Sequence, residues 1–482
     1  MRSSVAVTLG LMLFLRLIAP PEISGAASEV RVWTTSLELK TKLTEGAPIH
    51  FEPALPKAEL TLRINAARRY QTMLGLGASL EHSTCSNLWR LDVPARERTL
   101  RRLLDPVDGI GMNLMRICIG TSDFAGEDWY SYDDLSAGQT DPELKGFSIA
   151  RDRAYVLPAI QLAHRINSNT LFFASPWSPP GWMKSTGTMI GGELLPRWYA
   201  TYADYFVRFI QAYQAEGIPI YAVTVQNEPG VDRAKATDPK WHYPSCHWSA
   251  EAERDFIRDH LGPALRRAGL ATRIWCYDHN YNLESKGESP GLAHPRTILS
   301  DPRAAAMVAG VAFHHYEGQP SGMSRFHDEF PGKPIHFSEG SVFSIYAPHD
   351  LMERLRHWAC SYNAWVVMLD ERGRPNRGPF PATRAILRLH SDTGEVEELF
   401  EYYAYGHFMK FIGRGAVRIE STPGDHHFNN VAFENPDGSI VLVVVNTTEE
   451  AKRFTVQWKE AALSGRLGAQ TVATYVWKGA AP

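Results

Sequence analysis

The chain has 482 residues, of which 44% are hydrophobic and 21% charged, and a formal net charge of −3. This size and composition are typical of a globular protein with one large domain and a smaller one. A net charge so close to zero gives no electrostatic basis for binding nucleic acid or an anionic membrane surface.

The first 27 residues have the pattern of a secretory signal peptide. Arg2 precedes an apolar run at 5–15, and small residues follow at 25–27. The apolar run is too short to span a bilayer and is followed by Arg16, and no later segment is long and apolar enough. The sequence therefore predicts a secreted or extracytoplasmic protein, cleaved after Ala27, with no stable membrane span.

Strands dominate the next segment, and alternating strands and helices follow. Short runs at 30–33, 37–43 and 58–64 predict N-terminal strands within residues 28–70. The clearest helix begins near Trp198, where aromatic residues recur at spacings of three and four. Eight apolar strand candidates lie at 73–78, 112–119, 171–175, 220–226, 272–277, 309–315, 335–339 and 364–369. This alternation predicts an α/β fold, a (β/α)8 TIM barrel over residues 71–411.

The helical pattern ends near residue 412. A turn at 435–438 separates apolar runs at 430–433 and 439–445, and two more runs follow at 453–458 and 471–477. These strands predict a small antiparallel domain over residues 412–482. We expect it to pack with the N-terminal strands as one β-sandwich built from both chain ends.

Two glutamates close apolar strands of the predicted barrel. Glu228 ends the run 221–227 just before Pro229, and Glu339 ends the run 334–338 just before a glycine. In a TIM barrel the active site lies at the C-terminal ends of the strands, and these are strands four and seven. A pair of carboxyl groups facing one pocket is the minimum equipment for hydrolysing a glycosidic bond.

The cysteine spacing and the lack of ligand-binding motifs limit which metals and cofactors the protein could bind. The five cysteines match no zinc-binding spacing, and their odd number leaves at least one without an intrachain partner: Cys85, Cys118, Cys246, Cys276 and Cys360. Buried free thiols are expected, with one disulfide involving Cys246 as an alternative. Because neither a glycine-rich phosphate loop nor a histidine-rich cluster follows a strand, the sequence predicts no cofactor and no catalytic metal.

The residues around the two glutamates resemble glycoside hydrolase family 30, the group that contains glucosylceramidases. The resemblance runs from Gly75 to the C-terminus, and its carrying stretches are 75–81, 115–116, 174–184, 226–229, 314–316, 337–340 and 403–408. The stretch Trp-Ser-Pro-Pro-Gly-Trp-Met-Lys at 177–184 is the most specific. The resemblance implies a barrel with a side β-sandwich, a retaining mechanism and a β-linked glycoside as substrate, either a glycolipid or an oligo- or polysaccharide.

The resemblance also implies roles for the residues that carry the chemistry. Glu228 matches the family's acid/base, and Glu339 matches its nucleophile. Asn227 matches the amide that binds the sugar 2-hydroxyl. Glu81 stands where glucosylceramidases carry an aspartate that binds the outer hydroxyls, and its extra methylene leaves the exact sugar open.

A supporting set of residues completes the expected pocket. Tyr316 and His314 match side chains near the nucleophile, and Trp177 and Trp365 match aromatic walls. The alternatives are that the indoles fill the core and that His314 is structural. Arg116 lies in a strand and must be paired if it is buried, so Glu339 is its expected partner, which would hold that carboxylate ionised.

Three functions remain in competition at this point. The first expectation is a secreted retaining β-glucosidase of the glucosylceramidase type. The main alternative is an endo-β-1,6-glucanase or another family member acting on polysaccharide. A non-catalytic carbohydrate-binding protein is less favoured, because such a protein has no use for both a proton donor and a nucleophile. The sequence leaves the oligomeric state open.

Overall fold

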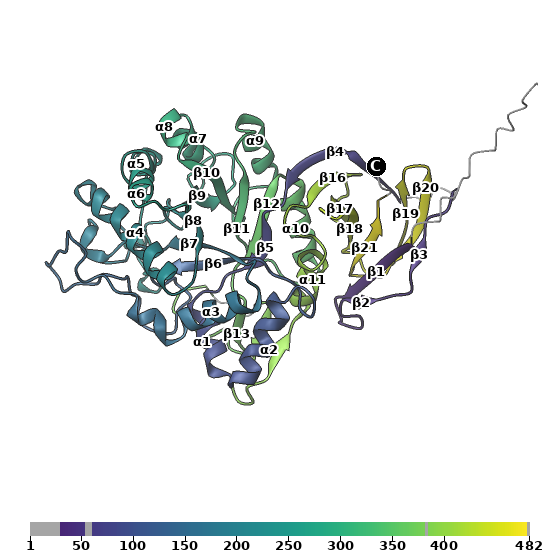
Figure 1. Ribbon diagram of the computed structural model, residues 1–482, viewed down its shortest axis with the longest axis horizontal. Helices are drawn as coiled ribbons and strands as arrows, with labels where there is room; N and C mark the ends of the chain where they lie inside the picture. Colours follow the sequence, from purple (N-terminus) through teal and green to yellow (C-terminus); the bar gives the residue numbers. More distant parts are fainter. Residues whose placement is uncertain (1–28, 54–59, 381–383, 480–482) are drawn as a thin grey trace, which may run out of the picture.

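A computed structural model describes residues 29–53, 60–380 and 384–479. Figure 1 shows a barrel of strands surrounded by helices, with a curled sheet beside it. The predicted signal peptide at 1–27 lies outside the described residues. Among the residues that are described, no helix combines the length and the hydropathy needed to cross a membrane.

Eight parallel strands form the barrel, in the order β5-β12-β11-β10-β9-β8-β7-β6. The ring closes between β5 and β6, where the Leu80 N–H donates to the Arg116 carbonyl at 2.8 Å. The strands are β5 Gly75–Ala78, β6 Leu114–Ile119, β7 Leu171–Pro176, β8 Ile220–Thr224, β9 Arg273–Asn280, β10 Val308–His314, β11 Ile335–Glu339 and β12 Ala359–Ala364. The predicted (β/α)8 barrel is confirmed.

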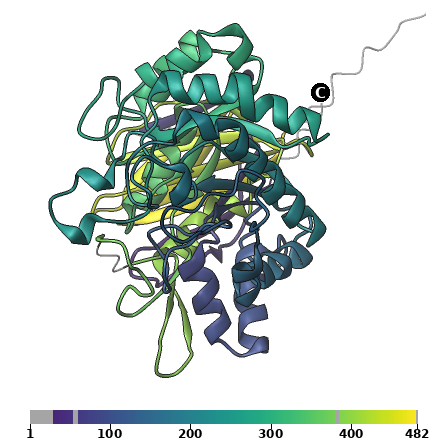
Figure 2. The ribbon, with the colours of Figure 1, turned by 90° about the vertical axis from the view of Figure 1, so that its left-hand side faces the viewer.

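The helices cover the outside of the barrel (Figures 1 and 2). In α4 the aromatic residues Tyr202, Phe206, Phe209 and Tyr213 are all buried, because their spacing places them on one face. The α-helices are α1 His82–Arg90, α2 Val93–Leu104, α3 Val156–Ile166, α4 Tyr199–Ala215, α5 Ala250–Phe256, α6 Gly262–Arg267, α7 Ala293–Leu299, α8 Pro302–Ala305, α9 Ser321–Glu329, α10 Tyr346–Arg356 and α11 Phe400–Met409. Shorter turns are the 3-10 segments Ala150–Ala154, Gly181–Met183, Pro196–Trp198, Arg233–Lys235 and Pro239–Trp241, and the π-helical segment Ile257–Leu261.

The eighth barrel strand is β12, and the prediction of a strand at 364–369 is wrong. That run begins where β12 ends, and its last residues form β13 Met368–Asp370 in a separate sheet. There β13 pairs with β14 Leu387–Leu389, which pairs with β15 Val396–Glu398. The β14–β15 hairpin extends from the body of the molecule in yellow-green near the bottom of Figure 2.

The polar sequence of β12 explains why it was missed. The strand reads Ala-Cys-Ser-Tyr-Asn-Ala, yet all six residues are buried. The Asn363 side chain donates to the Leu114 carbonyl at 2.8 Å, and the Ser79 hydroxyl donates to Asn363 Oδ1 at 3.3 Å. Polar side chains that are satisfied inside a barrel erase the apolar pattern by which buried strands are recognised.

The second sheet combines both chain ends, in the order β2-β1-β21-β18-β17-β16-β4-β19-β20, with β3 paired to β1. In the central strand β18, Val441 and Val443 belong to the core shared with the barrel, whereas Ile440 and Leu442 belong to the sheet's own core. Its strands are β1 Glu29–Ser36, β2 Thr44–Glu45, β3 Ile49–His50, β4 Leu60–Thr72, β16 Val417–Ser421, β17 Phe428–Glu434, β18 Ser439–Asn446, β19 Lys452–Trp458, β20 Ala461–Leu467 and β21 Thr471–Lys478.

The sheet departs from the prediction in three details. It is mixed, because β4 and β19 pair in parallel, whereas only antiparallel pairing was expected. The run 37–43 is a series of turns, in which Leu39 and Leu43 have positive φ angles of 56° and 51°. Strands β16 and β20 were not predicted. The predicted joining of both chain ends is confirmed.

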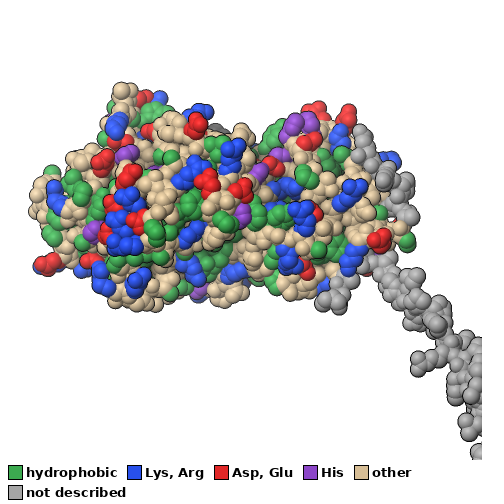
Figure 3. All heavy atoms as spheres, turned by 90° about the horizontal axis from the view of Figure 1, so that it is seen from above, with side chains coloured by type: hydrophobic (Ala, Val, Ile, Leu, Met, Phe, Trp, Pro, Cys, Tyr) green, Lys and Arg blue, Asp and Glu red, His purple; other side chains and the backbone are tan. Residues whose placement is uncertain are grey.

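All five cysteines are buried and free, so the alternative of a disulfide involving Cys246 is wrong. On the face seen in Figure 3, acidic and basic side chains are interspersed over the described surface. This mixture agrees with the small net charge of −3.

Candidate active site

Glu228 and Glu339 reach one cavity from the ends of two parallel strands. Glu339 is the last residue of β11, and Glu228 lies in the turn that follows β8. Both line a cavity of about 470 Å³. Glu228 has a φ of 52°, and its N–H donates to the Asp278 carbonyl at 3.0 Å. Such a backbone angle is uncommon outside glycine and, where it persists, is often associated with functional sites.

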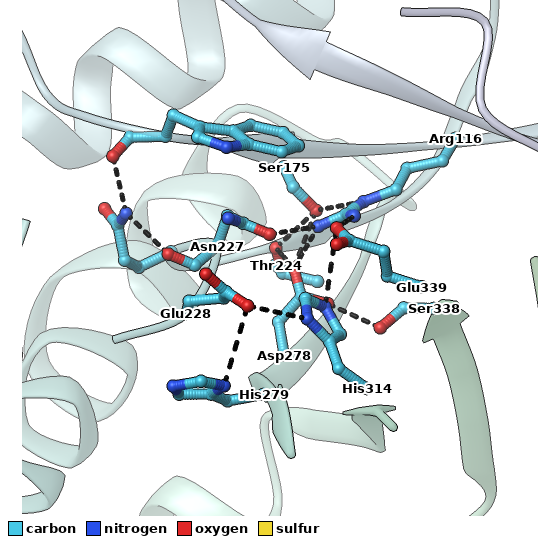
Figure 4. A network of polar contacts seen from close by, with 12 residues as sticks. Arg116, Ser175, Thr224, Asn227, Glu228, Asp278, His279, His314, Ser338 and Glu339 are labelled. Carbon is cyan, nitrogen blue, oxygen red and sulfur yellow. Dashed lines mark hydrogen bonds and ion pairs between the residues drawn. The ribbon is translucent and has the colours of Figure 1, made fainter. Parts of the chain in front are cut away.

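Arg116 on β6 links the nucleophile candidate to its neighbours (Figure 4). Its Nη1 donates to Glu339 Oε2, which is the pairing expected from the sequence. Its Nη2 donates to Asn227 Oδ1 at 2.7 Å and to Asp278 Oδ2 at 2.9 Å. Tyr316 donates its hydroxyl to the other oxygen of Glu339, Oε1, at 2.7 Å. Both oxygens of Glu339 are therefore held in place.

Burial and opposite charges set the protonation states of this network. Burial alone would lower the pKa of Arg116, but the charges on Asp278 and Glu339 raise it above its usual value. Burial alone would also raise the pKa of Asp278, but Arg116 and the hydrogen bond from His314 hold it far below its usual range. Arg116 and Asp278 form a fully buried ion pair.

His314, at the end of β10, lies between the two glutamates. Its Nδ1 is 3.4 Å from Glu228 Oε1, and its Nε2 is 3.1 Å from Asp278 Oδ1 and 3.9 Å from Glu339 Oε2. Burial lowers the pKa of His314, but the charge on Glu339 and the bonds to Asp278 and Glu228 raise it to about 9. Burial raises the pKa of Glu228, but the hydrogen bond from His314 and nearby positive charges lower it to about 2. The Glu228–His314 pair thus shares one proton over a wide pH range.

Trp177 and Trp365 line the cavity together. Their rings stack with centroids 5.2 Å apart, and they are 3% and 7% exposed. The Arg116 guanidinium lies 4.9 Å from the centroid of Trp177 and 5.6 Å from that of Trp365. The two indoles therefore give the cavity an aromatic wall that also contacts the buried cation.

Glu81, which the family resemblance gave as a sugar-binding residue, does not line the cavity. Its carboxylate caps α1, accepting from the Thr84 N–H at 3.0 Å, and it is absent from the cavity lining. Asp123 lines the cavity instead. Asp123 lies in the run Thr-Ser-Asp-Phe, four residues after the end of β6, so its place in the loop that follows a strand was the signal that could have identified it. Burial, with the charges on Glu339 and Glu228, raises its pKa to about 8.

Other lining residues come from loops and were not predicted. Arg233 pairs with Glu288 at 2.8 Å, and its guanidinium lies 4.6 Å from the centroid of Tyr243. Phe343 and Phe380 also line the cavity. These loops have no hydrophobic periodicity, so no pattern in the sequence distinguishes their lining residues from their exposed ones.

Among the described residues, one group has the geometry to hold a metal ion, formed by Glu228, His279 and His314. The remaining predicted residues, Asn227 and Tyr316, also line the cavity. Apart from Glu81, every predicted site residue therefore lies in the cavity lining or in direct hydrogen-bond contact with it.

Comparison with known proteins gives consistent matches over most of the chain. The profile of the glycosyl hydrolase family 30 TIM-barrel domain matches residues 73–412, and that of the family's β-sandwich domain matches 415–475. An endo-1,6-β-D-glucanase of Neurospora crassa is 32% identical, covering 96% of this chain and 98% of the relative. The lysosomal acid glucosylceramidase of Mus musculus is 27% identical, covering 87% and 84%. A solved endo-β1,6-glucanase superposes with a TM-score of 0.83 at 31% identity, covering 94% of this chain and 99% of that one.

Proposed function

Since the chain belongs to glycosyl hydrolase family 30 and acts on O-glycosyl bonds, we propose that it is a retaining endo-β-1,6-glucanase. The observation that carries the proposal is the meeting of Glu228 and Glu339 in one cavity of a chain that β-1,6-glucanases match over nearly its full length. This function was the alternative in the sequence analysis. It replaces the glucosylceramidase expectation because the relative and the solved structure at 32% and 31% identity both carry the glucanase name.

We assign the nucleophile to Glu339 and the acid/base to Glu228. Glu339 attacks the anomeric carbon of the sugar while Glu228 protonates the departing glycosidic oxygen. Arg116 and Tyr316 hold the two oxygens of Glu339, so the attacking carboxylate loses little freedom on the way to the transition state. Water, deprotonated by Glu228, then releases the sugar with its configuration retained.

The proton for the first step comes from the Glu228–His314 pair. In the unliganded cavity this proton resides on His314, because its pKa is the higher of the two. A bound sugar displaces water from Glu228 and so makes its negative charge more costly. The proton then moves from His314 Nδ1 to Glu228 Oε1, across the 3.4 Å that separates them.

The substrate sugar lies against Trp177, between Asn227 and Asp123. The Oδ1 of Asn227 already accepts from Arg116, so its side-chain N–H groups are what it offers to a sugar hydroxyl. Asp123 takes the role that the sequence analysis gave to Glu81, because it lines the cavity and Glu81 does not. Its raised pKa allows it to donate as well as accept at neutral pH.

Glucosylceramide hydrolysis is the second candidate, supported by the glucosylceramidase relatives. Both activities use the same two carboxylates and differ only in the leaving group. A carbohydrate-binding protein without activity fits the cavity less well, because it would gain nothing from a proton donor and a nucleophile that face the same cavity.

A substrate panel separates these candidates. Reducing-end release should be measured on β-1,6-glucan, β-1,3-glucan, glucosylceramide and an aryl β-glucoside, with Glu339→Gln as the matched inactive control. We expect β-1,6-glucan to be cleaved fastest and to give a ladder of oligosaccharides, with the β-anomer appearing first by NMR. Preferred turnover of glucosylceramide would favour the second candidate, and an α-anomer as first product would contradict the retaining mechanism.

We further propose that the chain is exported, on the basis of Arg2 and the apolar run at 5–15. The mass and N-terminal sequence of the protein collected outside the cell should correspond to a chain beginning at Ser28. Retention of residues 1–27 in the mature protein would reject this proposal.

A further inference from the structure

Three potential metal ligands converge on one point of the cavity. Glu228 Oε1 lies 3.4 Å from His314 Nδ1 and 3.9 Å from His279 Nδ1. The ligand atoms of all three residues lie within 4.8 Å of one another. In a tetrahedral zinc site with bonds of roughly 2.1 Å, ligand atoms are separated by roughly 3.4 Å. A small rotation of the two imidazoles therefore suffices to bring the three groups into coordination geometry.

His279 has a free coordinating nitrogen aimed at this point. Its side chain is 2% exposed, and neither ring nitrogen has a hydrogen-bond partner of normal geometry among the described residues. The backbone of Glu288 contacts the ring and raises the pKa of His279, against the larger effect of burial, which lowers it. A buried polar group without a partner is costly, so His279 is poised to take up a ligand. Figure 4 shows it below Glu228, with His314 to the right.

His314 is oriented as a metal ligand would be. Its Nε2 donates to Asp278 Oδ1 at 3.1 Å, which leaves Nδ1 facing Glu228. A carboxylate behind the distal nitrogen is the usual support of a zinc-bound histidine, because it fixes the ring and makes the imidazole more basic. Asp278 is itself held by Arg116 and Ser338, so the support is rigid.

From this arrangement we propose that the cavity contains an inhibitory zinc site formed by Glu228, His279 and His314. The three residues supply one carboxylate and two imidazoles, a ligand set that suits Zn²⁺, and the fourth position opens to the cavity and takes water. The ion replaces the single proton that Glu228 and His314 share, and this proton leaves to solvent. The negative charges on Glu339 and Asp278 lie close by and favour the cation.

Zinc at this position removes the acid/base from catalysis. A carboxylate that coordinates Zn²⁺ can neither donate a proton to the leaving oxygen nor accept one from water. The ion also occupies space that the glycosidic oxygen needs, so substrate and zinc exclude each other. The binding itself is independent of the proposed function, and only the inhibition depends on it.

Calorimetric titration of the full mature chain with ZnCl₂ tests the binding. We expect one equivalent of zinc per chain, with affinity reduced at least about tenfold in His279→Ala and in Glu228→Gln. The two variants change different ligands, so one remains informative if the other fails to fold. The matched control is the exposed pair His426→Ala/His427→Ala, which should leave the affinity unchanged.

Two outcomes would overturn the proposal. Loss of binding in the His426→Ala/His427→Ala control, with normal affinity in His279→Ala, would show a surface site only. The absence of saturable binding by the wild-type chain would show that there is no site. Inhibition is measured separately, as competition between Zn²⁺ and an aryl β-glucoside that is reversed by EDTA. Zinc binding without any glycosidase activity would preserve the site and count against the proposed function alone.

Discussion

Two buried histidines have pKa values shifted in opposite directions, because the groups around them differ in charge. His314 lies among Glu228, Asp278 and Glu339, whose charges and hydrogen bonds overcome burial and raise its pKa to about 9. His407, on α11, is equally buried, and burial lowers its pKa to about 3.

The neighbours of His407 carry no charge. Its Nδ1 lies 2.8 Å from the Thr474 hydroxyl on β21, and its Nε2 lies 2.9 Å from the Thr35 hydroxyl on β1. It therefore joins the barrel to strands from both chain ends as a neutral hydrogen-bonding group. Burial is the same in the two cases, so the charge of the neighbours separates a histidine suited to chemistry from one suited to holding the fold together.

The largest expected effect comes from the carboxylate beside His314 that we assign as nucleophile. Glu339→Gln keeps the size of the side chain but cannot form the glycosyl-enzyme, so kcat/KM should fall at least about a thousandfold. The midpoint of thermal unfolding should change little. Near-normal activity in a folded variant would reject the assignment.

Glu228→Ala should have a smaller effect that depends on the leaving group. Substrates with poor leaving groups should lose about a hundredfold or more, because the proton donor is absent, whereas activated aryl glucosides should keep much of the first step. Added azide should restore turnover and give a β-glycosyl azide. Glu339→Ala with azide should give the α-product instead. Exchanged product configurations would show that the two roles are reversed.

Replacing His407, which joins the barrel to β1 and β21, should lower the free energy of unfolding and leave the activity unchanged. His407→Ala removes the two hydrogen bonds of the imidazole to the Thr35 and Thr474 hydroxyls and opens a cavity, so the free energy of unfolding should fall by about 2–4 kcal/mol. Denaturant titration measures this loss, and kcat/KM of the folded fraction should stay at the wild-type value. His407→Gln, which can still bond to a hydroxyl, should lose less. A variant that loses activity without losing stability would undo the contrast with His314.

The smallest effect concerns pH. The pKa of His407 is about 3 in the folded chain, below the unfolded value of about 6.5, so the unfolded chain binds the proton more readily. This contribution to stability is complete above about pH 6.5 and is lost as the pH falls toward 3. At pH 5 the loss is about 2 kcal/mol. Chemical denaturation at pH 7 and pH 5 should show it in wild type but not in His407→Gln, and equal losses in both would contradict it.

Much of the cavity lining could be predicted from the sequence, because the residues suited to catalysis also lie at the ends of predicted strands. Glu228 and Glu339 end apolar strands, and the barrel brings strand ends together. The contact between Arg116 and Glu339 followed from the need of a buried cation for a partner. Asp123 carried the same strand-end signal but was passed over for Glu81, which the structure uses as a helix cap.

The remaining features depend on contacts that sequence spacing does not encode. His407 forms a hydrogen bond with Thr35, which is 372 residues away in the chain, and no local sequence pattern predicts such a contact. The polar strand β12 was missed because its side chains are satisfied inside the barrel wall. His279 follows the predicted strand 272–277 between two other polar residues, Asp278 and Asn280, and only its approach to Glu228 distinguishes it from them.

The sheet made from both chain ends has a consequence for the order of synthesis. Strands β1 and β4 are synthesised before the barrel, but β21, which pairs with β1, and β16 and β19, which pair with β4, appear only after it. At about 5–20 residues per second, the 344 residues between the end of β4 at Thr72 and the start of β16 at Val417 take roughly 17–70 s to translate. The barrel strands are complete at Ala364 and can assemble in that interval. Throughout it, the 13 residues of β4 remain an unpaired strand edge, the kind of surface on which nascent chains aggregate and to which chaperones bind.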